Sequence, residues 1–118
     1  MNGFDEKWVT WFVDDFSGGS LEIILPSKVN FVKPRIPSWC NVHLENGREI
    51  TYVREDHIVN TLKDAIKICL EGIMVSFEKM DGDHFAANDE KELYHEKCEI
   101  ALEELKRLYL VDFPELFF

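Results

Sequence analysis

The first quarter of the chain has the hydrophobic pattern of a β-hairpin. Two stretches rich in aromatic and β-branched residues, 8–16 and 21–25, flank the pair Gly18-Gly19, which predicts two antiparallel strands and a turn near 8–25. The alternative is a helix over 4–16, because four apolar residues follow the i, i+4, i+7, i+8 spacing of one helix face. These residues are Phe4, Trp8, Trp11 and Phe12. We favour the hairpin.

A second hairpin is predicted over 41–53. Apolar and polar residues alternate on both sides of Asn46-Gly47, the pair preferred in type I′ turns. Because successive side chains of a strand point to opposite faces, Val42 and Leu44 share one face. Ile50 and Tyr52 share a face of the partner strand. Between the hairpins, residues 26–40 hold three of the four prolines, which predicts a loop or an irregular sheet edge.

Two amphipathic helices are predicted in the second half of the chain. The first spans about 56–71 and ends at Gly72, after which residues 73–77 form a short strand. The second spans about 89–109. The apolar stripe of the first helix consists of Ile58, Leu62, Ala65, Ile66, Cys69 and Leu70. That of the second consists of Tyr94, Cys98, Ala101, Leu102, Leu105, Leu108 and Tyr109.

The length and composition fit one domain with its own core, because the chain has 118 residues of which 46% are hydrophobic. The predicted fold class is α+β: a single domain over 1–118, with a mostly antiparallel sheet packed against the two helices. The apolar runs are too short to cross a bilayer. Two acids, Asp5 and Glu6, precede the first apolar stretch, unlike the basic start of a signal peptide. We therefore expect a cytoplasmic protein with no membrane contact.

The charge favours some partners over others. Acidic residues outnumber basic ones by 23 to 13, so the net charge is −10. This balance disfavours direct binding to nucleic acid or anionic lipid unless bases form a local patch. The bases of the first half are scattered along the sequence, at Lys28, Lys33, Arg35, Arg48 and Arg54, and predict no such patch. An acidic protein instead attracts a basic partner, mainly by raising the association rate.

Most of the excess negative charge lies in residues 81–104, which hold nine acids and two bases. Five acids of the second predicted helix recur at spacings of three and four, so they project from one face, opposite the apolar stripe. These are Asp89, Glu92, Glu96, Glu99 and Glu103. Within the row, no base falls at the i+3 or i+4 positions to neutralise these acids. Like-charge pairs at such spacings destabilise an isolated helix by about 0.2–0.5 kcal/mol each. The row therefore favours use as a docking surface, with an ordinary solvated helix face as the alternative.

The predicted partner-binding residues combine this row with its acidic lead-in and one aromatic anchor. They are Asp81, Asp83, Asp89, Glu92, Glu96, Glu99, Glu103 and Trp39. Trp39 is included because it lies in the proline-rich stretch, where we expect it to be exposed, and because tryptophan contributes strongly to interface energetics.

No motif for catalysis, for a cofactor or for a metal is present. The three cysteines, Cys40, Cys69 and Cys98, form neither a CxxC pair nor a disulfide framework, and we expect reduced, mostly buried thiols. The histidines lack HExxH and helical i, i+4 spacing. His57 is expected to have a cap or surface role, and the segment 81–84 is expected to be a turn rather than a calcium loop. The sequence therefore predicts no catalytic residue, no cofactor and no metal ligand.

In being small, acidic, α+β and without motifs, the chain is similar to bacterial immunity proteins. That resemblance is one of general class. It implies a toxin inhibitor whose carboxylates cover the basic active-site cleft of a cognate, nuclease-like toxin, with aromatic side chains at the desolvated centre. It also implies protein–protein binding rather than catalysis. We expect a monomer or weak homodimer, the latter closed by Phe117 and Phe118 of the apolar tail.

Three other functions remain open. A nucleic-acid mimic that inhibits a DNA-binding protein would spread its acids over a long surface. A small enzyme or ligand-binding domain would have a polar pocket between sheet and helices, containing His57 or His84. A subunit of a larger assembly would use the apolar tail.

Overall fold

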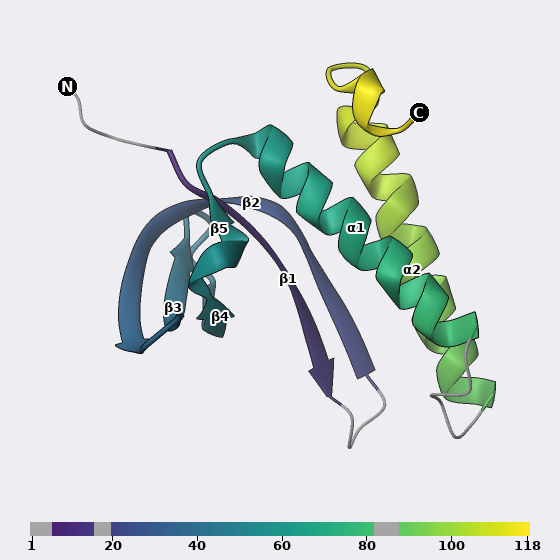
Figure 1. The fold of residues 1–118 in the computed structure, drawn as a ribbon, viewed down its shortest axis with the longest axis horizontal. Helices are drawn as coiled ribbons and strands as arrows, with labels where there is room; N and C mark the ends of the chain where they lie inside the picture. Colours follow the sequence, from purple (N-terminus) through teal and green to yellow (C-terminus); the bar gives the residue numbers. More distant parts are fainter. Residues whose placement is uncertain (1–5, 16–19, 82–87) are drawn as a thin grey trace.

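The computed structural model describes residues 6–15, 20–81 and 88–118. Along the chain, the elements are β1 (Trp8–Asp15), β2 (Ser20–Ile36), β3 (Trp39–Leu44), β4 (Glu49–Arg54), η1 (Glu55–His57), β5 (Ile58–Val59), α1 (Leu62–Asp81), α2 (Asn88–Tyr109) and η2 (Pro114–Leu116). The strands form one antiparallel sheet in the order β4-β3-β2-β1-β5, and both helices pack against it (Figure 1). The predicted α+β fold class is confirmed.

The β1–β2 hairpin, predicted near 8–25, is confirmed and lies at the centre of the molecule with both faces covered. On β1, Val9 faces one core and Phe12 packs against the other, as the two-residue period of a strand requires. The first core, which we call the strand core, consists of Val9, Ile24, Val29, Cys40, Val42, Leu44, Ile50 and Val53. The second, the helix core, consists of Cys69, Ile73, Tyr94, Cys98, Ala101 and Leu105.

Strand β2 excludes the loop predicted for residues 26–40 and agrees with the alternative prediction of an irregular sheet edge. It continues to Ile36, pairing first with β1 and then with β3. Its register shifts at Pro26, opposite β1, and again just after Pro34, and such bulges bend a strand. Beyond Lys28 the strand pairs only with β3, so its other side is a sheet edge. Pro34 is tolerated there although it has no N–H to donate to a neighbouring strand. The resulting hook of β2 around β3 and β4 is visible in Figure 1.

The second hairpin is confirmed, but its turn type was wrong. The Leu44 N–H donates to the Arg48 carbonyl (2.8 Å), and the Gly47 N–H donates to the Leu44 carbonyl (3.0 Å). Gly47 has φ +91°, whereas Asn46 has no positive φ. The loop therefore has three residues, 45–47, with a left-handed glycine at the end, rather than the two-residue type I′ turn.

Tyr52 does not share the buried face of Ile50, contrary to the sequence prediction. Val42 pairs with Ile50 and Cys40 pairs with Val53, so β4 carries one extra residue between them. This bulge places Val53 in the strand core and leaves Tyr52 exposed, with φ +57°.

Helix α1 is shifted relative to the predicted helix at 56–71. It begins at Leu62, where the Thr61 hydroxyl caps it by accepting from the Asp64 N–H (3.1 Å). It also runs through Gly72 and through the strand predicted at 73–77, to Asp81. Gly72 does not end the helix. A Cβ atom at this position would lie 2.7 Å from the ring of Phe12, so the glycine allows β1 to approach the helix closely.

Helix α2 matches the helix predicted over 89–109. The predicted stripe is buried or half-buried except for Leu108, which is exposed. In the tail, Phe117 packs against the helix core, whereas Phe118 is exposed. A salt bridge of 3.1 Å between Lys63 and Glu115 joins the tail to the start of α1.

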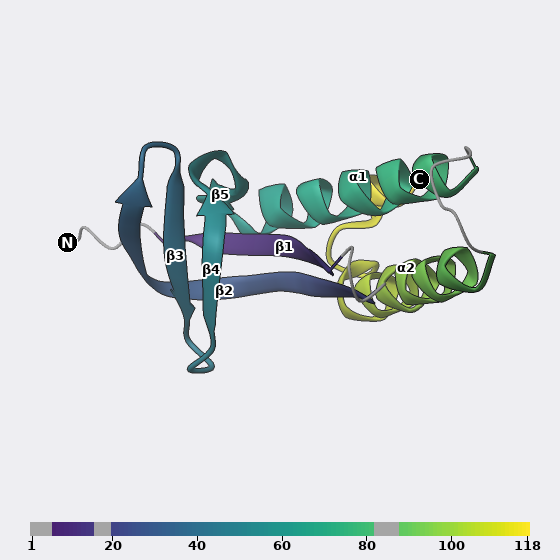
Figure 2. The same cartoon turned by 90° about the horizontal axis from the view of Figure 1, so that it is seen from below.

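The molecule is elongated, with the helices at one end and the hooked strands at the other (Figure 2). Its extents are 52 × 37 × 22 Å and its radius of gyration is 15.2 Å, above the roughly 13.5 Å of a compact chain of this length. Over the residues that the structure describes, neither helix is long and apolar enough to cross a membrane.

Candidate interaction surfaces

Helix α2 presents its carboxylates to solvent on the side opposite the helix core. Glu92, Glu96, Glu99 and Glu103 are all exposed, and we call these four residues the acidic face. Asp83 lies outside the described residues. The backbones of Asp81 and Asp89 fall within α1 and α2, but their side chains are not among those described.

Positive charge next to the acidic face is sparse but not absent, which corrects the prediction of an uncompensated row. His95 Nδ1 lies 3.2 Å from Glu99 Oε1, a pair that is charged only when the histidine is protonated. Arg107 pairs with Glu104, beside the row. Among the described side chains, Glu92, Glu96 and Glu103 have no ion-pair partner. At neutral pH these three carboxylates are therefore free to attract a cation.

An exposed aliphatic residue lies among these carboxylates. Ile100 is 61% exposed although it is large and apolar. Leu93, seven residues earlier on the same side of α2, is 41% exposed. Ile100 borders two surface hollows of about 330 and 590 Å³. The smaller one lies between β2 and α2 and is lined by Glu22, Ile23, Leu25, Lys97, Ile100, Ala101 and Glu104. The larger one is lined by Glu99, Ile100, Glu103, Glu104 and Arg107.

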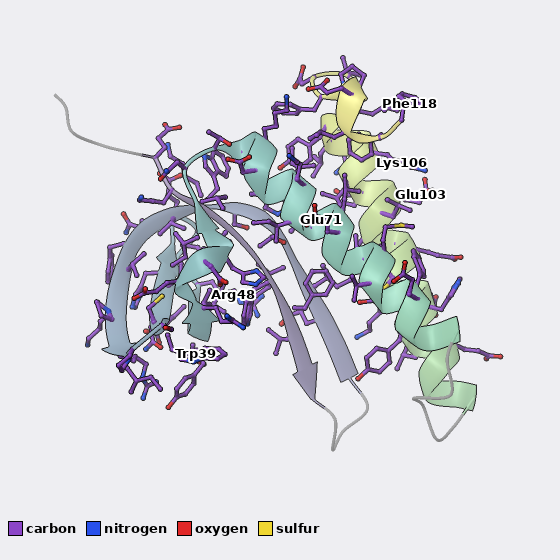
Figure 3. The ribbon with its side chains drawn as sticks, in the orientation of Figure 1. Trp39, Arg48, Glu71, Glu103, Lys106 and Phe118 are labelled. Carbon is purple, nitrogen blue, oxygen red and sulfur yellow. The ribbon has the colours of Figure 1, made fainter. Side chains whose placement is uncertain are left out.

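The structure does not bring Trp39 to the acidic face. Trp39 begins β3 and is half-buried rather than exposed. Figure 3 shows it at the end of the hooked strands, across the molecule from Glu103 on α2. The predicted partner-binding residues therefore do not form one surface.

A second exposed surface, not predicted from the sequence, lies on the outer side of β2, β3 and β4. The rings of Phe31 and His43 stack with their centroids 4.1 Å apart, and His43 Nε2 lies 2.8 Å from Glu49 Oε2. The guanidinium of Arg35 lies 4.4 Å from the centre of the Tyr52 ring. We call the residues Phe31, Lys33, Arg35, His43 and Tyr52 the aromatic face. The two-residue spacing of Phe31, Lys33 and Arg35 could have revealed it, had residues 26–40 been read as a strand.

The five bases that are scattered in sequence lie on β2, just before β4 and at the end of β4. Residues 28–54 hold five bases and two acids. Three of the bases have carboxylate partners: Lys28 with Glu6 and Glu45, Arg48 with Glu22, and Arg54 with Asp56. Among the described residues, Lys33 and Arg35 have no such partner. The two of these five bases that lack a carboxylate partner therefore lie on the aromatic face.

The pair of Arg48 and Glu22 is a bidentate ion pair. Arg48 donates two hydrogen bonds, of 2.9 and 2.6 Å, to the two oxygens of Glu22. This contact lowers the pKa of the Glu22 carboxyl. It ties the turn of the second hairpin to β2, beside the hollow that borders Ile100.

The described groups that could support catalysis or metal binding make packing contacts or line a surface hollow. His57 is half-buried and lies edge-on against Trp11, with centroids 4.9 Å apart, and His84 lies outside the described residues. A hollow of about 340 Å³ near η1 is lined by Ser38, Arg54, Glu55 and Asp56. Among the described residues, no three histidine, cysteine or acidic side chains gather as metal ligands would.

All three cysteines are free and buried, as the sequence predicted. Burial raises the pKa of the Cys69 thiol to about 11, and it also raises the pKa values of Cys40 and Cys98. These thiols are therefore protonated at neutral pH and lack the thiolate that nucleophilic chemistry needs.

The fold and these surfaces define a small acidic α+β protein with two exposed faces of opposite charge. No protein-family model, curated protein or solved structure significantly matches the chain.

Proposed function

We propose that this protein is an inhibitor that binds a basic protein through the acidic face of α2. More specifically, we propose a cytoplasmic immunity protein of bacterial type that neutralises a nuclease-like toxin by covering its active site. The observation that carries the proposal is the position of Ile100. It is an apolar side chain exposed to 61%, and it lies between two hollows and is bordered by Glu96, Glu99 and Glu103.

An apolar centre with a charged rim is the arrangement found in protein–protein interfaces. Ile100 and Leu93 would lose their contact with water on binding, which supplies affinity. The surrounding carboxylates would steer a cationic partner toward the face and fix its orientation. From Glu92 to Glu103 the acidic face spans about 17 Å of helix, a length that fits a compact cleft better than a long nucleic-acid mimic.

Inhibition would follow from occlusion. A nuclease must present cations to hold the phosphates of its substrate. Carboxylates spaced one helical turn apart can pair with those cations, so the substrate and the inhibitor would compete for the same groups. Such pairing acts at an exposed rim and weakens as salt rises.

The chain offers a matched pair of variants that tests this proposal. E96K/E103K reverses two charges of the acidic face, seven residues apart. E71K/E78K makes the same change at the same spacing on the exposed side of α1, and Figure 3 shows Glu71 on α1. Tagged wild-type protein and both variants are incubated with native lysate and with the product of the neighbouring gene, at low and moderate salt. The retained protein is then purified and its activity is titrated with each variant.

The proposal expects a basic protein that is retained by the wild type and by E71K/E78K but lost with E96K/E103K. The activity of that protein should be inhibited with the same ranking. Equal binding and inhibition by all three would show that the acidic face is only a solvated helix surface. Retention of a small molecule instead of a protein would favour a ligand-binding domain.

A further inference from the structure

Two faces with complementary chemistry lie at opposite ends of this molecule. The aromatic face carries the unpaired cations of Lys33 and Arg35 beside exposed rings, with Phe31 exposed to 52% and Tyr52 to 49%. The acidic face carries unpaired carboxylates beside Ile100. Each face therefore offers the charge that the other lacks, together with apolar surface to bury.

The chain cannot satisfy these charges within one molecule. The hooked strands and the helices occupy opposite ends of a body 52 Å long (Figure 2), and Figure 3 shows Trp39, at the strand end, far from Glu103 on α2. A twofold dimer built on either face alone would place like charges against each other. The complementary contact is thus possible only between the aromatic face of one copy and the acidic face of another.

We infer that the protein self-associates head to tail, with the aromatic face of one copy binding the acidic face of the next. Lys33 and Arg35 pair with Glu96 and Glu103 of the neighbour, and Ile100 packs against the rings of Phe31 and Tyr52. Rim ion pairs of this kind are weak and screened by salt, so the association is reversible and depends on protein concentration. Copies joined by one such contact keep one face free and extend into an open series, whereas two copies that pair both faces reciprocally close as a dimer.

This inference needs no partner and stands apart from the proposed function. The two are linked only because a basic partner would compete for the same acidic face. Self-association is measured on the purified protein alone, so its failure leaves the inhibitor proposal untouched.

The test uses sedimentation equilibrium over a range of protein concentrations, at low salt and at about 0.3 M salt, where screening extends to a few ångströms. The weight-average mass of the wild type should rise with concentration at low salt and fall back at high salt. Two charge-reversed variants are compared with it: E96K/E103K on the acidic face and K33E/R35E on the aromatic face. Circular dichroism verifies that each variant is folded.

Overall electrostatic repulsion between copies, acting alone, predicts stronger rather than weaker self-association for one of these variants. Each Glu→Lys change adds two charges, so E96K/E103K has a net charge of −6 instead of −10. If only overall repulsion mattered, this variant would associate more than the wild type. The inference expects its apparent dissociation constant to rise by about tenfold or more, whereas E71K/E78K, also at −6, should still associate at least as well as the wild type.

Mixing the two reversed variants provides the decisive measurement. E96K/E103K and K33E/R35E should each be monomeric alone, but an equimolar mixture should associate, since each then offers the other a face of opposite charge. A wild type that stays monomeric at low salt overturns the inference, and so does a mixture that fails to associate. Binding of a labelled single-stranded oligonucleotide by the wild type, lost in K33E/R35E and unaccompanied by self-association, would assign the aromatic face to nucleic acid and overturn it as well.

Discussion

At the scale of single residues, the Cys69 thiol is the group whose acidity the fold changes most clearly. It is fully buried in the helix core, and loss of hydration raises its pKa from 9.0 to about 11, against a smaller opposing effect of a hydrogen bond with Thr10. Below about pH 9 the thiol is protonated in both the folded and the unfolded chain. Between pH 9 and 11 only the unfolded chain ionises, so this residue favours unfolding progressively as the pH rises.

This linkage predicts a loss of stability on the alkaline side. By about pH 11 the Cys69 contribution should lower the free energy of unfolding by on the order of 2 kcal/mol. Cys69→Ala should be less stable at pH 7, because it leaves a cavity, but it should lose less stability between pH 8 and pH 11. Urea unfolding across this range measures both slopes. Cys40, Cys98 and Tyr109, whose pKa values are also raised, are common to the two proteins. Their burial effects cancel in the comparison, and only the smaller effect of the Cys69 charge on Tyr109 differs. Equal slopes would contradict the assigned role of Cys69.

At the scale of elements, the turn of the second hairpin differs from the turn type that its sequence predicts, and mutations can test this difference. A type I′ turn would place both Asn46 and Gly47 at positive φ, and Asn46→Gly would then be tolerated or stabilising. In the three-residue loop, Asn46 keeps a negative φ and its side chain accepts from the Arg48 N–H at 2.9 Å.

We therefore expect Asn46→Gly to destabilise the protein by about 0.5–1 kcal/mol, through lost chain rigidity and a lost hydrogen bond. Gly47→Ala should destabilise it by about 1 kcal/mol purely through backbone conformation, because nothing lies within 4 Å of the added Cβ. Chemical denaturation of both variants measures these changes. A gain in stability for Asn46→Gly would restore the two-residue turn.

Those elements that depend on local pattern were predictable from sequence, and those that depend on distant contacts were not. The periodicity of α2 fixed both its extent and the exposure of its acids, because both follow from one helix. The end of α1 was misplaced at Gly72, since the reason for that glycine is the ring of Phe12 on another element. The aromatic face was missed because it needs β2 to pair with β3 through a stretch that holds Pro34. Trp39 was grouped with the acids because of its residue type and its expected exposure in the proline-rich stretch, and no sequence pattern reports its distance from α2.

At the scale of the whole molecule, the two cores share a single central hairpin. Val9 faces the strand core, whereas Phe12 on the same strand packs against the helix core. If β1 detached from one core, apolar surface of the other core would also become exposed. Unfolding of one core should therefore cause unfolding of the other. The elongated shape therefore does not imply two independent folding units.

We therefore expect truncations in either core to shift one common unfolding transition. Val42→Ala in the strand core and Ile73→Ala in the helix core remove fully buried side-chain atoms and should each lower the free energy of unfolding by about 2 kcal/mol or more. Val111→Ala, at a site 90% exposed, is the control and should change little. Tryptophan fluorescence reports the strands, since all three tryptophans lie in β1 and β3, while circular dichroism at the helical band reports α1 and α2. The two signals should give coincident urea midpoints in every variant. If Val42→Ala moved only the fluorescence transition, the strand end would unfold by itself, and the shared hairpin would not couple the two ends of the molecule.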